Sequence, residues 1–260
     1  MSDLARTLLT SYTSGQPLAE PFSSSDPAFD MAAAYSVEAE FRRLRVASGR
    51  TVTGRKVGFA NKAMWRVLKL ETLVWASMYD DTTHDDTTHD GVTELALHRF
   101  MSPRIEPEIV FKLKQPLSGS PDAATALQHV DWMALGFEII DCPFPGWQFK
   151  PVDFVAAYGL HRALVIGEHR PADASLVDAL AAFKLRLYKN GELVEEGAGK
   201  NSLRSPALCL AELARATGGL ASGEIISTGT LTGAQGIAPG ETWSAEVEGL
   251  PLPKLQLRFF

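Results

Sequence analysis

The stretch that decides the fold of this 260-residue chain is Pro103-Arg104-Ile105-Glu106-Pro107-Glu108-Ile109-Val110-Phe111. Successive side chains of a β-strand alternate between its two faces, so Glu106 and Glu108 point one way and the isoleucines point the other. Two unpaired carboxylates on a half-buried face repel each other, and burial raises the pKa of at least one of them. A divalent cation removes that cost. The pattern predicts a strand with a cation site on its polar face, although a solvated amphipathic strand would show the same alternation.

A third acid follows about 30 residues later, inside an apolar run. Glu138 lies in Ala134-Leu135-Gly136-Phe137-Glu138-Ile139-Ile140, with apolar neighbours on both sides. Three buried carboxylates on adjoining strands suit a hard cation such as Mg²⁺ or Mn²⁺, with coordination positions left for an oxygen-rich ligand. Together, Glu106, Glu108 and Glu138 predict a metal site.

A lysine between glycines is the second candidate site residue. In Thr51-Val52-Thr53-Gly54-Arg55-Lys56-Val57-Gly58, alternation places Gly54, Lys56 and Gly58 on one face of a predicted strand. Glycine inside a strand often marks the close approach of backbone or ligand. The lysine could hold a carboxylate or stabilise an enolate as charge develops. A glycine-containing turn with a surface lysine would explain the same stretch.

Composition limits the classes of protein to which the chain can belong. A net charge of −6 and the absence of a basic cluster argue against nucleic-acid binding. The N-terminus shows no signal-peptide pattern, and no apolar run reaches membrane-spanning length. The two cysteines, Cys142 and Cys209, match no metal-binding or disulfide spacing. We therefore expect a cytoplasmic protein that acts on a small molecule and binds neither nucleic acid nor membrane.

The distribution of helix and strand patterns predicts an α+β protein in two parts, an N-terminal helical segment over residues 1–50 and a catalytic β-domain over 51–260. Asp26 is the expected cap of a helix that runs to about Ala47, with Pro27 in its first turn. Asn190-Gly191 predicts a tight hairpin turn. Further helices are expected over residues 123–129 and 206–217.

A tandem repeat occupies residues 81–90, where Asp-Thr-Thr-His-Asp occurs twice in succession. Histidine and aspartate at short spacing invite comparison with a metal site. The segment is acidic and has no apolar anchor, which favours a duplicated surface loop. Such a loop would be either inert or a lid over the active site.

Four motifs in fixed order resemble the hydratase and decarboxylase branch of the fumarylacetoacetate hydrolase superfamily. They are Gly54-Arg55-Lys56-Val57-Gly58, the Pro103–Phe111 stretch, Gly136-Phe137-Glu138-Ile139-Ile140 and Ser227-Thr228-Gly229-Thr230-Leu231-Thr232-Gly233. The branch includes 2-oxopent-4-enoate hydratase and 4-oxalocrotonate decarboxylase, and the resemblance spans nearly the whole chain. It implies the mixed β-sandwich roll of that family, with N-terminal and peripheral helices.

The resemblance also implies roles for individual residues. Glu106, Glu108 and Glu138 would bind Mg²⁺ or Mn²⁺, Lys56 would be catalytic, and Lys62 and Thr230 would contact substrate. Asp153 matches the aspartate that begins the family's D-x-x-A-D-N segment, but Ala157-Tyr158 stands where the family has D-N. We expect His161, together with Asp153, to replace that missing pair as the proton carrier.

The implied activity is hydration of a short 2-hydroxydienoic or 2-oxoenoic acid to a 4-hydroxy-2-oxo acid by a metal-dependent lyase. A 4-oxalocrotonate-type decarboxylase is the alternative, and it would need a cation for the second carboxylate, with Lys62, Arg66, Lys150 and Lys200 as candidates. A C–C hydrolase and a non-catalytic partner subunit are further alternatives. The resemblance also implies a homo-oligomer, with a complex between paired hydratase and decarboxylase as a further expectation.

Overall fold

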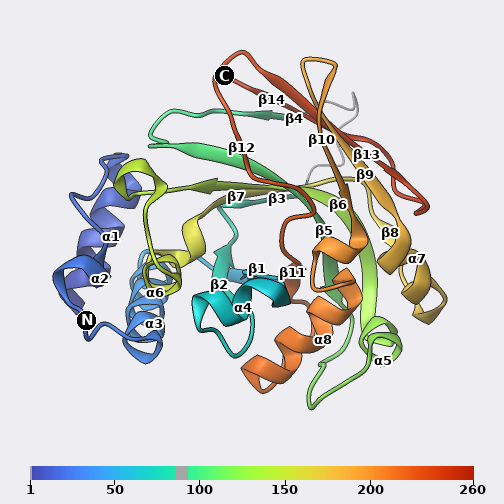
Figure 1. Cartoon of the computed structure of the whole chain (residues 1–260), viewed down its shortest axis with the longest axis horizontal. Coiled ribbons are helices and arrows are strands. Elements are labelled where there is room, and N and C mark those ends of the chain that lie inside the picture. The colour runs from blue at the N-terminus through green and yellow to red at the C-terminus, as the bar shows by residue number, and fades with distance from the viewer. Residues whose placement is uncertain (1, 86–92) are drawn as a thin grey trace.

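Two β-sheets form the centre of the protein in a computed structural model that describes residues 2–85 and 93–260 (Figure 1). The larger sheet has the strand order β2-β1-β11-β5-β6-β7-β3, with β12 paired to β5 and β8 paired to β6. Its strands are β1 Val52–Gly58, β2 Val74–Tyr79, β3 Thr83–Asp85, β5 Pro103–Leu113, β6 Val130–Asp141, β7 His161–Ile166, β8 Arg170–Pro171, β11 Ile225–Ser227 and β12 Gln235–Gly236.

The second sheet has the strand order β10-β9-β13-β14-β4. Its strands are β4 Thr93–Leu95, β9 Lys184–Lys189, β10 Glu192–Ala198, β13 Thr242–Glu248 and β14 Leu255–Phe259. The helices are α1 Ser2–Ser14, α2 Phe22–Ser25, α3 Met31–Ala47, α4 Lys62–Leu68, α5 Ala123–Gln128, α6 Pro151–Ala156, α7 Val177–Ala182 and α8 Pro206–Thr217. The mixture of curled sheets and peripheral helices confirms the predicted α+β class.

Most of the helices gather in two groups, and α4 lies between them (Figure 1). Helices α1, α2, α3 and α6 lie together at one end, and α5, α7 and α8 lie at the other. The main core is formed by inward side chains of both sheets with α8, and includes Phe111, Phe137 and Trp243. Burial of these large apolar side chains is the main source of stability.

A separate apolar cluster joins the N-terminal helices to the rest of the chain. Leu8 and Tyr12 of α1 and Phe41 of α3 pack in one cluster with Phe154 of α6 and the following Tyr158. The N-terminal segment therefore shares its core with residues from the middle of the chain. Whether residues 1–50 form a domain of their own stays a prediction.

Polar side chains cap the N-termini of α3, α4, α5 and α8, and the cap of α3 differs from the residue that we predicted. Helix α8 begins after Ser205, whose side chain accepts a hydrogen bond from Ala207 N, and ends at Gly218 in the left-handed conformation. Asn190 and Gly191 both have positive φ angles in the β9–β10 turn, as predicted. The predicted cap of α3 is wrong, because Asp30 rather than Asp26 accepts from Ala33 N.

The first copy of the tandem repeat is not the loop that we expected. Residues Thr83–Asp85 form β3, which pairs in parallel with β7. Asp81 forms ion pairs with Arg45 and Arg50. The second copy, residues 86–90, lies outside the described residues. The predicted choice between an inert loop and a lid therefore stays a prediction. No helix within residues 2–85 and 93–260 is long and apolar enough to cross a membrane.

Candidate active site

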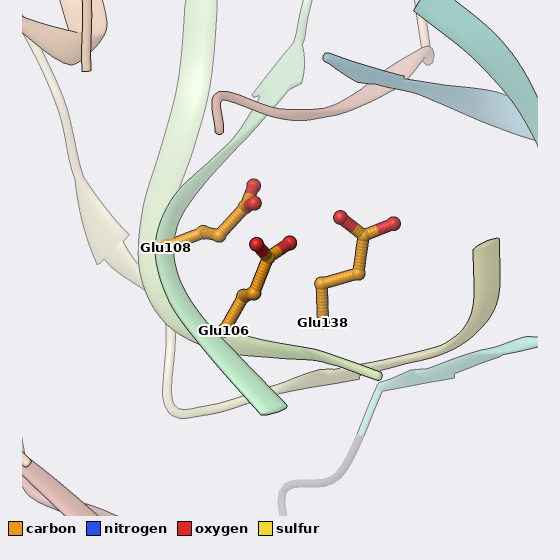
Figure 2. Close-up of side chains that lie close together, drawn as sticks. All are labelled: Glu106, Glu108 and Glu138. Atoms are coloured by element: carbon orange, nitrogen blue, oxygen red, sulfur yellow. The ribbon is translucent and has the colours of Figure 1, made fainter. Parts of the chain in front are cut away.

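Three carboxylates converge at the centre of the larger sheet (Figure 2). Glu106 and Glu108 leave the same face of β5, and Glu106 lies directly opposite Glu138 of β6 in the antiparallel register. Each residue offers one carboxylate oxygen, and these three oxygens lie within 4.8 Å of one another. Glu108 and Glu138 are buried, whereas Glu106 is partly exposed. Strand alternation and strand pairing therefore bring the three predicted acids together.

A hydroxyl donor at the end of β11 and a backbone donor just after it hold Glu108. Ser227 Oγ donates to Glu108 Oε2 at 2.5 Å, and Gly229 N donates to the same oxygen at 2.8 Å. Both donors are on one oxygen, and Glu108 Oε1 is buried with no hydrogen-bond partner among the described residues. A buried oxygen without a partner costs the free energy of its lost hydration. Binding of a cation to Glu108 Oε1 would therefore remove that cost.

Lys56 places a positive charge beside the carboxylates. Its Nζ lies 2.8 Å from Glu138 Oε2 and donates to the carbonyl oxygen of Gly159 at 3.0 Å. Gly159 has a φ of +62°, and a Cβ there would lie 2.8 Å from Lys56 Cδ, so a side chain at this position would displace the lysine. Strand β1 and the Gly159 turn together fix the ammonium in a buried position.

The three carboxylates, Lys56 and His161 lie close enough for their charges to shift the pKa values of one another. Burial and the neighbouring Glu138 raise the pKa of Glu106 to about 7, and burial with both neighbouring acids raises the pKa of Glu108 well above its usual range. Burial opposes ionisation of Glu138 too, but Lys56 and His161 hold the pKa of Glu138 below its usual value. Burial alone would lower the pKa of Lys56, but the charges of the three carboxylates outweigh this effect and raise it above its usual value. Without a cation, one carboxylate is therefore paired with the lysine and the others tend to retain protons.

His161 contacts Glu138 from the side opposite the lysine. Its Nδ1 lies 2.9 Å from Glu138 Oε1, and its Nε2 lies 3.0 Å from Thr82 Oγ1. The ring is 2% exposed, and each of its two nitrogens has a protein partner. Thr82 comes from the first copy of the tandem repeat, which gives that segment a contact with the site through His161.

His161 and Asp153 have different hydrogen-bond partners in the structure, and their joint role as proton carrier stays a prediction. Asp153 accepts hydrogen bonds from Ser23 N and Oγ and from Lys150 N, at 2.7–2.9 Å. Its carboxylate thereby connects α2 to the first turn of α6, where a negative charge is favourable. The structure thus gives Asp153 a place in the attachment of the N-terminal helices.

A cavity of about 540 Å³ opens beside the carboxylates. Glu106, Lys56 and the predicted substrate contact Thr230 line it. Lys62 does not, because its side chain lies at the start of α4 and lines a separate hollow with Arg204, Glu212 and Arg215. The remaining lining residues are Val57, Gly58, Phe59, Ala60, Asn61, Ile140, Trp147, Phe149, Phe154, Leu160, Asn201, Gly229, Leu231, Thr232 and Ala234.

Comparison with known proteins gives this arrangement a family. The family model for the C-terminal part of fumarylacetoacetate (FAA) hydrolase matches residues 82–257. The chain belongs to this family. This result confirms the predicted resemblance, and the β5 and β6 carboxylates lie within the matched region.

Two classes of enzyme in the family are similar to the chain over most of its length. The 2-hydroxyhexa-2,4-dienoate hydratase of Comamonas testosteroni is 30% identical over 241 residues, which cover 91% of this chain and 89% of that enzyme. A 4-oxalocrotonate decarboxylase of Pseudomonas sp. (strain CF600) is 31% identical over 229 residues, with 86% and 84% coverage. The structure of 4-oxalocrotonate decarboxylase from Pseudomonas putida G7, complexed with magnesium and adipate, matches with a TM-score of 0.88 at 28% identity, covering 100% of this chain and 97% of that one.

The residues of this FAA hydrolase family member fit a divalent cation. The donor set consists of carboxylate oxygens alone, which hard cations such as Mg²⁺ and Mn²⁺ prefer. Glu108 Oε1 is buried and without a partner, and Ser227 and Gly229 orient its carboxylate as outer ligands commonly do at metal sites. Glu106, Glu108 and Glu138 are the residues that would hold the cation.

Sequence reasoning missed several residues that shape the site. Ser227 and Gly229 lie inside a motif that the sequence singled out, but nothing in that motif pointed to Glu108 as their partner. Phe59 and Trp147 have positive φ angles of 54° and 59°, which no local pattern predicted. Thr82 lay in a repeat that was interpreted as a loop.

Proposed function

We propose that this chain is a metal-dependent hydratase that adds water to a short 2-hydroxydienoic or 2-oxoenoic acid and gives a 4-hydroxy-2-oxo acid. The observation that carries the proposal is the group of three converging carboxylates, two of them buried, with Lys56 at one end of the cavity. The similarity to dienoate hydratases supports it. A bound cation would supply Lewis-acid chemistry at the oxygens of the 2-oxo acid.

Lys56 is proposed to stabilise the negative charge that develops on the substrate. Its Nζ is the positive charge that both contacts Glu138 and lines the cavity. A preorganised ammonium in a buried site interacts with a developing enolate far more strongly than in water. The dienol first ketonises, with loss of its hydroxyl proton and gain of a proton at C5, which leaves a C3–C4 double bond conjugated to the 2-oxo group and makes C4 electrophilic. An O–H bond of water then breaks as its oxygen bonds to C4, and a proton is added at C3.

His161 is proposed to position Glu138 rather than to carry a proton directly. The ring is buried behind Glu138, does not line the cavity, and bonds Thr82 through its other nitrogen. A histidine with one nitrogen on a ligand carboxylate and the other on a hydroxyl fixes the orientation of that carboxylate. Glu106, by contrast, is the one of the three acids that lines the cavity.

Decarboxylation of a 4-oxalocrotonate-type diacid is the second candidate, and the similarity to such decarboxylases favours it. The substrate's second carboxylate would need a cation. Among residues 2–85 and 93–260, Lys56 is the one cationic side chain that lines the cavity, and the four predicted candidates, Lys62, Arg66, Lys150 and Lys200, do not line it. This favours the hydratase.

The remaining alternatives have less support. A C–C hydrolase of the expected type needs a histidine nitrogen free to bind water, and both nitrogens of His161 have protein partners. A non-catalytic subunit would not need an intact carboxylate triple beside a buried lysine. The predicted homo-oligomer and paired complex stay predictions.

The test is a comparison of two substrates. Purified protein should consume 2-hydroxypenta-2,4-dienoate faster than 4-oxalocrotonate when Mg²⁺ is present. The rate is measured as the loss of the ultraviolet absorbance of the conjugated system. Removal of Mg²⁺ with a chelator should abolish turnover, and Mg²⁺ should restore it. Faster turnover of 4-oxalocrotonate would replace the hydratase by the decarboxylase.

A further inference from the structure

A wall of aromatic rings leads away from Lys56 along the cavity. The ring of Phe154 lies 5.1 Å from Lys56 Nζ, and Phe149 follows with its ring centroid 6.2 Å from that of Phe154. Trp147 comes next, 6.3 Å from Phe149. Phe59 joins the wall beside Phe154, at 5.0 Å. The buried Phe154 gives way to the partly exposed Phe149 and Trp147, so the wall runs outward.

The backbone is arranged to place these rings. Gly58 allows the Phe154 ring to lie against β1, because a Cβ there would lie 2.5 Å from Phe154 Cε1. Phe59 has a left-handed backbone, and Trp65 Nε1 donates to its carbonyl oxygen at 2.7 Å. Trp147 is also left-handed and its Nε1 donates to Ser102 Oγ. Left-handed φ values at large side chains are strained, and such strain is found where function requires a particular placement.

The far side of the cavity offers few polar groups to a ligand. Asn61 Oδ1 accepts from Ala63 N, and Asn201 Nδ2 donates to the carbonyl oxygen of Leu231. Thr230 and Thr232 each donate to a nearby backbone carbonyl. Apart from Glu106 and Lys56, these polar side chains of the lining are uncharged, and each already has a backbone partner for one of its polar atoms or its hydroxyl.

The other cations near the wall are directed elsewhere. The guanidinium of Arg104 stacks over the Trp147 ring, 4.0 Å from its centroid, and Arg104 is not among the residues that line the cavity. Lys150 lines a separate hollow beside Phe149. Within the described ranges, 2–85 and 93–260, the distal part of the cavity therefore presents no charge that would recognise a second carboxylate.

We propose that the substrate carries an apolar group, an alkyl chain of about three or more carbons or a phenyl ring, at the distal end of its dienoate, and that the Phe59, Phe149, Phe154 and Trp147 wall binds it. The inference rests on the proposed function and names the substrate class of the same site. A cavity of about 540 Å³ is in the range that accommodates ligands much larger than a five-carbon acid. Ile140, Leu160 and Ala234 line the cavity as well and add apolar surface.

The experiment is a series of 2-hydroxy-2,4-dienoates with hydrogen, methyl, propyl, pentyl or phenyl at C5, assayed with Mg²⁺. If the wall binds the tail, each added methylene should raise kcat/KM about fourfold until the cavity is full. The analogue with a carboxylate at that end should be the poorest of the series. A flat or falling trend with tail length would overturn the inference while leaving hydration in place, and preference for the carboxylate would overturn both the inference and the proposed hydration.

Phe149→Ala provides the variant that tests the wall itself. It should lower kcat/KM for the pentyl substrate at least tenfold more than for the unsubstituted one. Phe260→Ala is the matched control, because that ring is 60% exposed at the C-terminus and does not line the cavity. An equal loss on both substrates would assign Phe149 to general packing and contradict the proposal.

A binding measurement separates this inference from the proposed function. Saturated 2-oxo acids of five to nine carbons, and 2-oxoadipate, can be titrated into the Mg²⁺-loaded protein by calorimetry. Affinity that rises with chain length supports the apolar tail even if no dienoate is hydrated. Affinity that is independent of length, or highest for 2-oxoadipate, would overturn the inference whatever the reaction proves to be.

Discussion

The two ends of the cavity are built from different kinds of structure. At the carboxylate end, Glu106, Glu108, Glu138 and Lys56 all lie on paired strands of the larger sheet, and each of the two buried acids is hydrogen-bonded to named partners. At the aromatic end, Trp147 and Phe149 come from the connection between β6 and α6, outside regular strands. The strands hold the groups that carry charge, and a connecting segment holds the groups that would choose the substrate.

This contrast leads to a general expectation. Changes at the carboxylate end should reduce turnover of all substrates by the same factor, because they remove charge stabilisation common to every 2-oxo acid. Changes at the aromatic end should reduce turnover in proportion to the size of the distal group. The experiments below test the carboxylate end, from the largest expected effect to the smallest.

The largest loss is expected from Glu108→Gln. The substitution keeps the size of the side chain and removes the charge of a carboxylate whose Oε1 lacks a partner. We expect metal-dependent turnover to fall by about a thousandfold or more, and Mg²⁺ affinity by at least a hundredfold, measured by calorimetry. The melting temperature of the metal-free protein should not fall, because the raised pKa of Glu108 already favours its neutral form. Full activity in this variant would exclude the cation site.

Lys56→Met should lower kcat by a factor of about 10², as when one preorganised donor is removed. Methionine retains much of the buried stem, so the loss reports the ammonium. Lys62→Met is the matched control, since Lys62 lines a different hollow, and we expect it to leave kcat and KM unchanged. An unchanged kcat with a raised KM for Lys56→Met would show that the lysine only binds substrate. A loss in Lys62→Met would restore its predicted role.

His161→Ala should weaken Mg²⁺ binding by about 10- to 100-fold through the orientation of Glu138. Saturating Mg²⁺ should recover most of the turnover, because the histidine does not reach the cavity. Thr82→Val should show the same effect on a smaller scale. His129→Ala is the control and should show none, because the His129 ring contacts the Pro116 carbonyl oxygen and does not line the cavity. If His161→Ala abolishes hydration while Mg²⁺ affinity is unchanged, the histidine is a proton carrier after all.

The smallest effect concerns pH and the metal-free protein. The pKa of Glu106 is raised from 4.5 to about 7, so the folded chain holds a proton that the unfolded chain releases. This contribution to stability is present below pH 4.5 and is lost as pH rises to about 7. Glu108 acts in the same direction. The lowered pKa of Glu138 acts in the opposite direction, because its contribution to stability is present above pH 4.5 and is lost as pH falls below that value.

The melting temperature without metal should therefore fall by a few degrees between pH 4.5 and about 7, and Mg²⁺ should raise it more at high pH than at low pH. Glu106→Gln removes one titrating group and should reduce the slope. If the melting temperature of this variant depends on pH as steeply as that of the unchanged protein, Glu106 does not retain its proton in the folded state.

The sequence predicted the carboxylate end far better than the aromatic end, for a physical reason. Alternation within β5 fixes the faces of Glu106 and Glu108, and one isolated acid in an apolar strand identifies Glu138, so local pattern was sufficient. The partners of His161 and Asp153 depend on which distant segments pack together, and local pattern carries no such information. Phe59 and Trp147 take backbone angles that the sequence around them does not favour, so tertiary contacts decide them.

The same distinction explains the smaller errors. Asp26 and Asp30 are both good caps, but Asp26 ends α2 and accepts from Ala28 N, whereas Asp30 accepts from Ala33 N and caps α3. The repeat has a polar composition typical of loops, but its first copy contributes β3 because β7 offers a free edge. Lys62 follows the lysine motif in sequence, but the turn of the chain at Asn61 directs its side chain out of the cavity.

The ion pair between Lys56 and Glu138 has a consequence for how the protein comes into being. Small zinc domains are unfolded until their metal arrives, because metal binding supplies the free energy that folds them. Here the chain supplies its own positive charge to the ligand cluster. Lys56 Nζ lies 2.8 Å from the Glu138 carboxylate, which the lysine would later share with the metal. Synthesis and folding can therefore be complete before any metal is acquired. A cell short of magnesium or manganese would accumulate a folded, inactive reserve that loading alone converts to working enzyme.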